Sequence, residues 1–141
     1  MKSSFLACSV YAFALAAMIC THRLSNAIVE IWVAQPYTLG THGEAWEDWH
    51  GVGCLFLALT NLAAHRWTEP RPRRDIAAAT AVIFGGWAAQ NLVFMFGSRF
   101  TPAMWLNVAG CALASVASVV TARSQHALAA RASSIISSDS V

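Results

Sequence analysis

The chain has 141 residues, which is enough for one domain. Hydrophobic residues make up 57% of it and charged residues only 11%, against about 25% charged residues in a typical soluble domain. This composition argues against a water-soluble globular fold, because so few charges would leave apolar surface exposed. The net charge of +2, without a basic groove carrying interleaved aromatic residues, argues against a nucleic-acid partner.

The first apolar run, from about Phe5 to Cys20, predicts a membrane-spanning helix. It is slightly short, because a bilayer core of about 30 Å needs about 20 helical residues. A cleaved secretory signal is the alternative, since Lys2 precedes the run and residues 25–27 form a tolerable cleavage site. The run is long for a signal peptide, and His22-Arg23 separates it from that site. A retained span is therefore the preferred interpretation.

The segment 21–49 is predicted to form an outer or lumenal cap that is ordered and partly helical. Its tryptophans need apolar contact and are typical of the aromatic belt at a membrane interface. These tryptophans are Trp32, Trp46 and Trp49. The second span is predicted at about residues 50–65, and the polar pair Thr60-Asn61 makes it the weakest of the four.

The third and fourth spans are Ile76–Phe96 and Ala103–Ala122, and both are long enough to cross a bilayer without a formal charge. Asp75 is predicted to cap the third helix. Thr101-Pro102 is predicted to begin the fourth, with proline where no amide donor is needed. Segment 69–75 contains two prolines and is predicted to be a tight polar hairpin outside any helix.

These spans predict an all-α fold, an integral-membrane four-helix antiparallel bundle over residues 1–123. The tail 124–141, rich in Ala and Ser, is predicted to be partly helical and then disordered. Basic residues concentrate at one end of the predicted bundle, and only Arg23 and Arg99 fall at the other. The concentrated set is Lys2, Arg66, Arg71, Arg73, Arg74, Arg123 and Arg131. The positive-inside rule therefore predicts a multi-pass protein with both termini cytoplasmic.

Polar side chains are predicted to gather in the outer half of the bundle. At a rise of about 1.5 Å per residue, Asn91, Asn107 and Cys54 lie roughly 6 to 9 Å below the outer ends of their spans, and His22 and His50 lie at the rim. Such residues within membrane spans usually face the bundle interior and often mark function. The structural alternative is that amides and hydroxyls merely join helices, and this is the preferred interpretation for Asn107. In the inner half of the predicted bundle, the only polar side chains of this kind are Asn61 and His65.

Residues 42–50 contain the densest group of reactive side chains. Three carboxylates, two imidazoles and two indoles occur there: Glu44, Glu47, Asp48, His42, His50, Trp46 and Trp49. A structural interpretation is a helix start whose acids complement the helix dipole. A chemical interpretation is proton transfer, because desolvation near lipid favours the protonated acid, which can donate a proton while an imidazole accepts one.

We therefore expect a small integral-membrane enzyme that isomerises or cyclises a lipophilic substrate such as a sterol, terpenoid or polyketide. The predicted acids are Glu47, Asp48 and Glu44, and the predicted bases are His50 and His42. The predicted substrate-binding residues are Trp46, Trp49, Cys54, Gln90, Asn91, Asn107 and His22. The predicted partners are the lipid bilayer and the lipophilic molecule, together with a homo-oligomer or another membrane protein.

Two other functions stay open from the sequence. One is a non-catalytic membrane subunit of a larger complex. The other is a metal-dependent membrane oxygenase, in which His42, His50 and His22 with the nearby carboxylates would supply metal ligands. No recognised metal or haem motif is present, so no metal site is assigned and the cofactor is unknown. No span carries a predicted buried charge, which argues against an ion pump.

Overall fold

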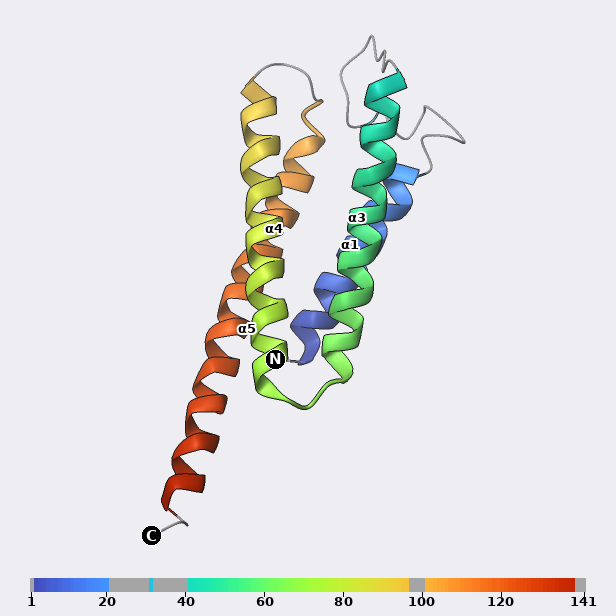
Figure 1. Cartoon of the computed structure of the whole chain (residues 1–141). Helices are drawn as coiled ribbons and strands as arrows, with labels where there is room; N and C mark the ends of the chain where they lie inside the picture. The colour runs from blue at the N-terminus through green and yellow to red at the C-terminus, as the bar shows by residue number, and fades with distance from the viewer. Residues whose placement is uncertain (1, 21–30, 32–40, 97–100, 139–141) are drawn as a thin grey trace.

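The computed structural model describes the backbone of residues 2–20, 31, 41–96 and 101–138, and the side chains of 3–20, 31, 49–93, 95–96 and 101–131. Within these residues the chain is all-helical and has no strand (Figure 1). The helices are α1 (Lys2–Cys20), α3 (Thr41–Arg66), α4 (Pro70–Phe96) and α5 (Met104–Ser138). The all-α prediction is confirmed.

Three helices are long and apolar enough to cross a membrane, namely Ser3–Cys20 of α1, Pro70–Val93 of α4 and Met104–Arg131 of α5. The prediction of a membrane protein rests on these three. Helix α3 falls below the same apolar threshold within the described residues. Its acidic first turns and the polar pair Thr60-Asn61 lower its hydrophobicity, as expected for the weakest predicted span.

Helix α3 begins at Thr41, well before the predicted start at His50. The last nine residues of the predicted cap therefore belong to this helix. Residues 21–30 and 32–40 of that cap lie outside the described residues. Helix α5 likewise continues through most of the predicted tail and ends at Ser138, and it projects beyond the other helices (Figure 1).

The predicted hairpin at 69–75 is wrong, because α4 already begins at Pro70 and the loop consists only of residues 67–69. Proline is tolerated in the first turn of a helix, where its missing amide would have no partner, and both Pro70 and Pro72 lie there. Asp75 is consequently not a helix cap. Its carboxylate instead accepts hydrogen bonds from the neighbouring Arg74 guanidinium, at 2.6 and 2.8 Å.

The chain enters α5 through a turn at residues 101–103, so Pro102 precedes the helix and is not its first residue as predicted. The amides of Met104, Trp105 and Leu106 donate to the carbonyls of Thr101, Pro102 and Ala103, so a tight turn precedes the helix. The Thr101 hydroxyl also donates to the Ile31 carbonyl. This bond ties the start of α5 to a residue between α1 and α3.

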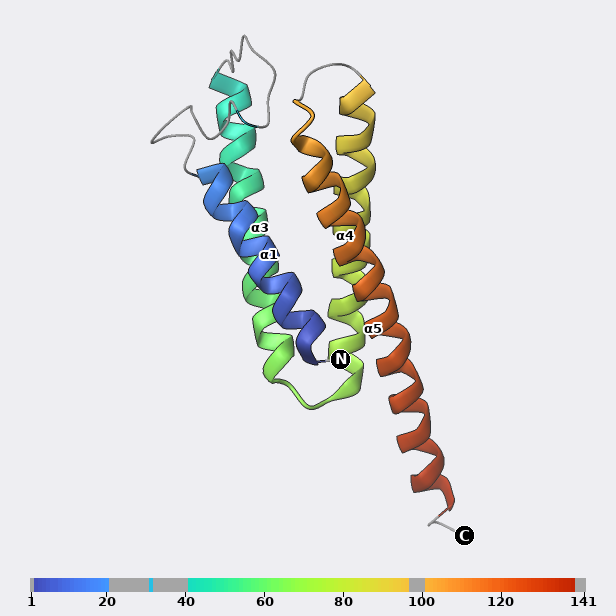
Figure 2. The same ribbon diagram turned by 180° about the vertical axis from the view of Figure 1, so that it is seen from behind.

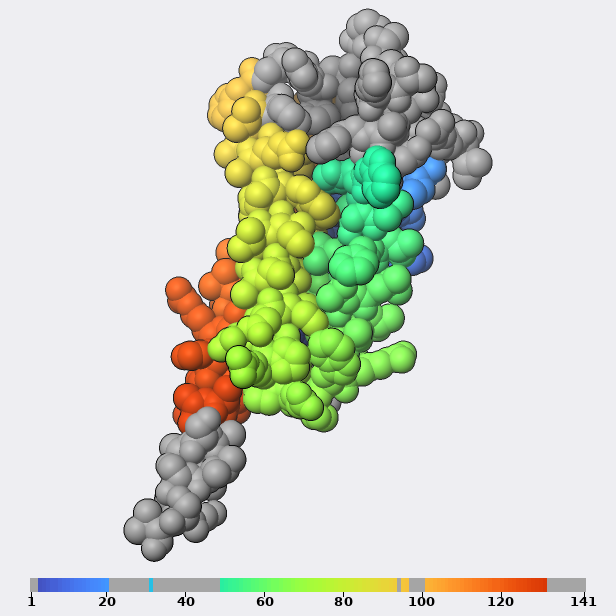
Figure 3. Space-filling view, viewed as in Figure 1, coloured from blue at the N-terminus to red at the C-terminus, as the bar shows by residue number. Residues whose placement is uncertain are grey.

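The helices lie side by side, with α1 and α4 running in one direction and α3 and α5 in the other (Figure 2). The most extensive contacts are between α1 and α3 and between α4 and α5, and fewer contacts join these two pairs. In the space-filling view, the side chains of α3 and α4 meet near the loop that joins them (Figure 3). All four helices contribute to the main core cluster: Cys8, Ala12, Leu15, Ala16, Cys54, Leu57, Ala58, Phe84, Cys111 and Ala114.

Side-chain hydrogen bonds cross each of the four helix–helix contacts. They are Ser9 Oγ to the Ala58 carbonyl (2.8 Å), Ser115 Oγ to the Ala81 carbonyl (2.8 Å), Asn61 Nδ2 to Thr80 Oγ1 (3.0 Å), and Ser4 Oγ with Thr121 Oγ1 (2.7 Å). Small hydroxyl and amide side chains serve this purpose between apolar helices. Asn61 and Ser115 each make an interhelical hydrogen bond of this kind.

The Asn61 contact supports a first prediction. Asn61 is 1% exposed, and its Nδ2 donates to Thr80 and to the Leu57 carbonyl. We expect Asn61→Ala to lower the free energy of unfolding in detergent micelles by about 1 kcal/mol. Thr60→Ala is the matched control, because the Thr60 hydroxyl bonds only within α3, to the Phe56 carbonyl. Equal stability of the two variants would contradict a structural role for the Asn61–Thr80 contact.

Candidate functional site

The acidic, tryptophan-rich segment lies on the first turns of α3. The backbones of His42, Glu44, Trp46, Glu47 and Asp48 are helical, and their side chains lie outside the described residues. Residues three and four apart lie on one face of a helix, so the helix places Glu47 and Trp46 on the face that carries His50. The helical register therefore brings a predicted acid and a predicted base to one side of α3.

Two neighbouring side chains of this segment are described. Trp49 is 74% exposed and His50 is half-buried, so they lie on different sides of α3. The interior-facing side chain is His50, whose imidazole lies against the Trp87 indole of α4, with ring centroids 4.7 Å apart and planes at 37°. This contact joins the α1–α3 pair to the α4–α5 pair.

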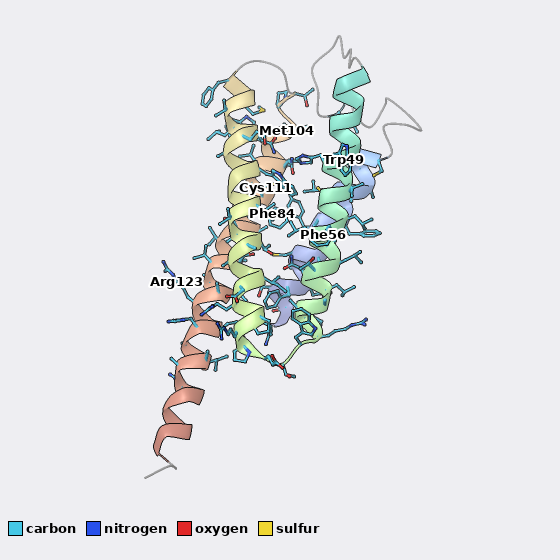
Figure 4. All side chains as sticks on the ribbon, in the orientation of Figure 1. Trp49, Phe56, Phe84, Met104, Cys111 and Arg123 are labelled. Carbon is cyan, nitrogen blue, oxygen red and sulfur yellow. The ribbon has the colours of Figure 1, made fainter. Side chains whose placement is uncertain are left out.

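A row of aromatic rings leads from His50 into the core. Trp87 meets Phe84 edge-on, with centroids 5.6 Å apart, and Phe84 lies 5.5 Å from the ring of Tyr11 on α1. Figure 4 shows Phe84 between the helices, whereas Phe56 lies on the outer side of α3. Phe84 is completely buried. The rings therefore fill the space below His50 and leave the imidazole at the upper edge of this packing.

The hydroxyl of Tyr11 continues the row to α5. It donates to Asn107 Oδ1 at 2.7 Å, lies 3.2 Å from the Asn107 carbonyl oxygen, and lies 3.5 Å from Cys111 Sγ. A Cβ at Gly110 would lie only 2.5 Å from the Tyr11 hydroxyl oxygen, so the phenol packs directly on the backbone of α5. Asn107 is thus a hydrogen-bond partner of Tyr11.

The structure separates the other predicted site residues. Cys54 is buried in the main core, Asn91 is half-buried, and Gln90 is exposed. His22 lies outside the described residues. Among the described predictions, Cys54 and Asn107 belong to the packed region below His50, while Gln90 lies at the surface.

Tyr11, Phe84 and Trp87 were not predicted as site residues from the sequence. Trp87 carried a signal, because a tryptophan deep in a predicted span departs from the interfacial pattern. Tyr11 carried one as well, because a buried phenol needs a hydrogen-bond partner. No sequence signal distinguished Phe84, since one phenylalanine in an apolar helix resembles any other.

Within the parts of the chain whose side chains are described, no group of three or more His, Cys, Asp or Glu residues converges as a metal site would require. Comparison with known protein families, with curated proteins and with solved structures gives no match. The geometry around His50 is therefore the main indication of function.

Proposed function

We propose that the protein is a small integral-membrane enzyme that transfers a proton on a lipophilic substrate, isomerising or cyclising it. The observation that carries this proposal is the position of His50. Its imidazole packs on Trp87 at the junction of the two helix pairs, on the same face of α3 as Glu47. An acid and a base beside indole rings form a suitable environment for a cationic transition state, because indole faces attract cations.

The membrane arrangement is part of the proposal. We place α3 across the bilayer with α1, α4 and α5, as an antiparallel four-helix bundle. Its polar side chains, such as Asn61, face the interior, whereas Phe56, Leu59 and Val52 are exposed. This distribution suits a helix that contacts lipid on one side and other helices on the other. Neighbouring helices thus compensate for the modest hydrophobicity of α3.

The proposed orientation has both termini in the cytoplasm. The end that carries the α3–α4 loop contains Arg66, Arg71, Arg73 and Arg74, and the positive-inside rule places such a loop on the cytoplasmic side. His50 and the acidic turns of α3 then lie at the opposite, outer side. The substrate would enter there, above the packed floor formed by Phe84 and Tyr11.

In the proposed reaction, His50 accepts a proton from the substrate and a carboxylic acid of the preceding turns donates one. Glu47 is the preferred acid because it lies one turn before His50, and Asp48 and Glu44 are the alternative acids on the same turns. His42 is the alternative base. Trp46 and His22 would contribute to the upper wall, whereas the exposed Trp49 lies on another side of α3. Asn91 would border the site from α4, and Cys54 and Asn107 would belong to its floor.

A metabolite experiment tests this proposal. We expect deletion of the gene to remove one lipophilic product and to accumulate its precursor, and the intact gene to restore both levels. His50→Ala and Glu47→Ala should each lower turnover by about 10²- to 10⁴-fold, the usual contribution of acid–base catalysis. His65→Ala is the matched control, at the other end of α3. Normal turnover in both the His50 and Glu47 variants, at unchanged protein levels, would reject the proposal.

Gln90 favours the second candidate, a non-catalytic subunit of a membrane complex. Its carboxamide is exposed within the candidate membrane span of α4, and polar groups within membrane spans usually face protein. A second copy or another membrane protein would satisfy it. This candidate predicts that Gln90→Leu changes the mass of the detergent-solubilised assembly, whereas the enzyme proposal predicts no such dependence.

A further inference from the structure

The strongest unassigned feature is a buried arginine at the end of the helices opposite His50. Arg73 lies in the first turn of α4 and is only 6% exposed. Its Nε and Nη2 atoms have no hydrogen-bond partner among the residues that the structure describes. Buried donors of a charged group normally pair, and leaving them unpaired is costly. Arg73 therefore needs an explanation that helix packing does not supply.

Arg73 packs against an aromatic ring. Its guanidinium carbon lies 5.1 Å from the centroid of the Phe5 ring of α1, a cation–π contact. One turn further along α4, Ala77 packs with Phe5 and Ala64 in a small core at this end of the molecule. The ring covers one face of the guanidinium plane, and the Nε and Nη2 donors at its edge have no acceptor within the described part of the chain.

No acid of the described part of the chain serves as that acceptor. Asp75 is exposed and is engaged by Arg74, with the two charged groups 2.6 Å apart. Glu69 is exposed in the loop before α4. Further basic side chains surround this end, and their nitrogen tips gather near Arg123 and the α3–α4 loop (Figure 4). The local field is therefore positive, which favours an anion.

We propose that Arg73 binds the phosphate of an anionic phospholipid headgroup on the cytoplasmic side of the membrane. A guanidinium fork matches two phosphate oxygens, and basic sites between helices at this side of a membrane bind anionic headgroups. Both α4 and α5 also expose apolar residues on their outer faces, Val82 and Val120, as a surface in contact with acyl chains would. This surface favours a lipid over free phosphate.

The binding motion follows from the burial of the donors. In the conformation described, Nε and Nη2 have no contact with solvent, so the guanidinium must swing outward on its methylene stem to meet a headgroup. Arginine side chains in membrane proteins extend in this way toward the interface. The inference rests on the proposed membrane orientation but not on the proposed chemistry at His50, which lies at the other end of α3.

Native mass spectrometry of the full chain, purified from vesicles of phosphatidylcholine with added phosphatidylglycerol, tests the inference. We expect the wild type to retain phosphatidylglycerol in preference to phosphatidylcholine. Arg73→Gln should reduce this retention about tenfold, the effect of losing a charge-assisted pair of hydrogen bonds. Arg71→Gln, at an exposed position of the same turn, should reduce it less than about twofold.

Two further measurements keep the test decisive. Arg73→Lys retains the charge without the fork and should retain an intermediate amount of phosphatidylglycerol, while its thermal unfolding shows that the variant is folded. Inorganic phosphate added to the wild type should leave the bound lipid in place. Equal lipid retention by Arg73→Gln and the wild type would overturn the proposal. Displacement of the lipid by inorganic phosphate would show that Arg73 binds free phosphate and not a lipid headgroup.

Discussion

Replacing Phe84 with alanine is expected to lower the free energy of unfolding by about 3 kcal/mol, the low end of the range for a buried phenylalanine. Phe84 is 0% exposed and contacts both Tyr11 and Trp87. Its removal leaves a cavity where the two helix pairs meet. The low end applies because lipid also solvates apolar side chains, so that lost packing accounts for most of the cost. Reversible unfolding in mixed micelles measures the difference.

Phe56→Ala is the matched control for Phe84→Ala. Phe56 is 73% exposed on the outer side of α3, and we expect its replacement to change the unfolding free energy by less than about 0.5 kcal/mol. The same substitution on neighbouring helices thus separates interior packing from loss of aromatic surface. Similar losses in the two variants would show that Phe84 does not lie in a packed core.

Replacing Gly110 with alanine is expected to have the second largest effect. The new Cβ would lie 2.5 Å from the hydroxyl oxygen and 2.7 Å from Cζ of Tyr11, much closer than van der Waals contact. The phenol cannot withdraw without breaking its hydrogen bond to Asn107, so α1 and α5 must separate. Overpacking of this kind costs about 1 to 3 kcal/mol, which the unfolding free energy of the variant measures.

Gly86→Ala provides the control for Gly110→Ala, because a Cβ at Gly86 meets no atom within 4 Å. Alanine is the better helix former, so this variant should gain about 0.5 to 1 kcal/mol. Tyr11→Phe removes the atom nearest to the new methyl group. The combination of Tyr11→Phe and Gly110→Ala should therefore cost less than the sum of the single changes. Strict additivity would contradict the close approach of Tyr11 to α5.

The sequence predicted the helices better than their ends. Long apolar runs without charges identify α1, α4 and α5 because lipid exposure requires them. The prolines of the first turn of α4 were misinterpreted as helix breakers, since composition alone does not distinguish a turn from a helix start. Asp75 was misassigned as a cap for the same reason. The acids at 44–48 favoured a helix start in this region, but they did not identify Thr41 as its first residue.

The depth of the candidate site residues along the bundle was predictable from the sequence. The direction in which their side chains point around the helix axis was not. The helical rise per residue predicts Asn107 and Cys54 in the outer half of the proposed bundle. It does not predict which neighbouring side chain each one faces. The Tyr11–Asn107 hydrogen bond depends on that direction, as does the contact between His50 and Trp87. The burial of Arg73 was not expected either, because charges near span ends usually reach water or headgroups.

The proposed membrane-spanning bundle requires the two ends of α3 to lie on opposite sides of a membrane. Cysteine labelling tests this placement directly. Native Cys20 is exposed at the His50 end, and Cys8, Cys54 and Cys111 are buried. A Thr68→Cys, Cys20→Ser variant reports the α3–α4 loop, and Cys20→Ser alone gives the background.

A membrane-impermeant maleimide should label Cys20 of the wild type in intact cells and should reach residue 68 of the variant only after the membrane is opened. Labelling of both positions in intact cells, with the background variant unlabelled, would place the two ends on the same side. That result would contradict the membrane-spanning bundle and, with it, the outer site at His50.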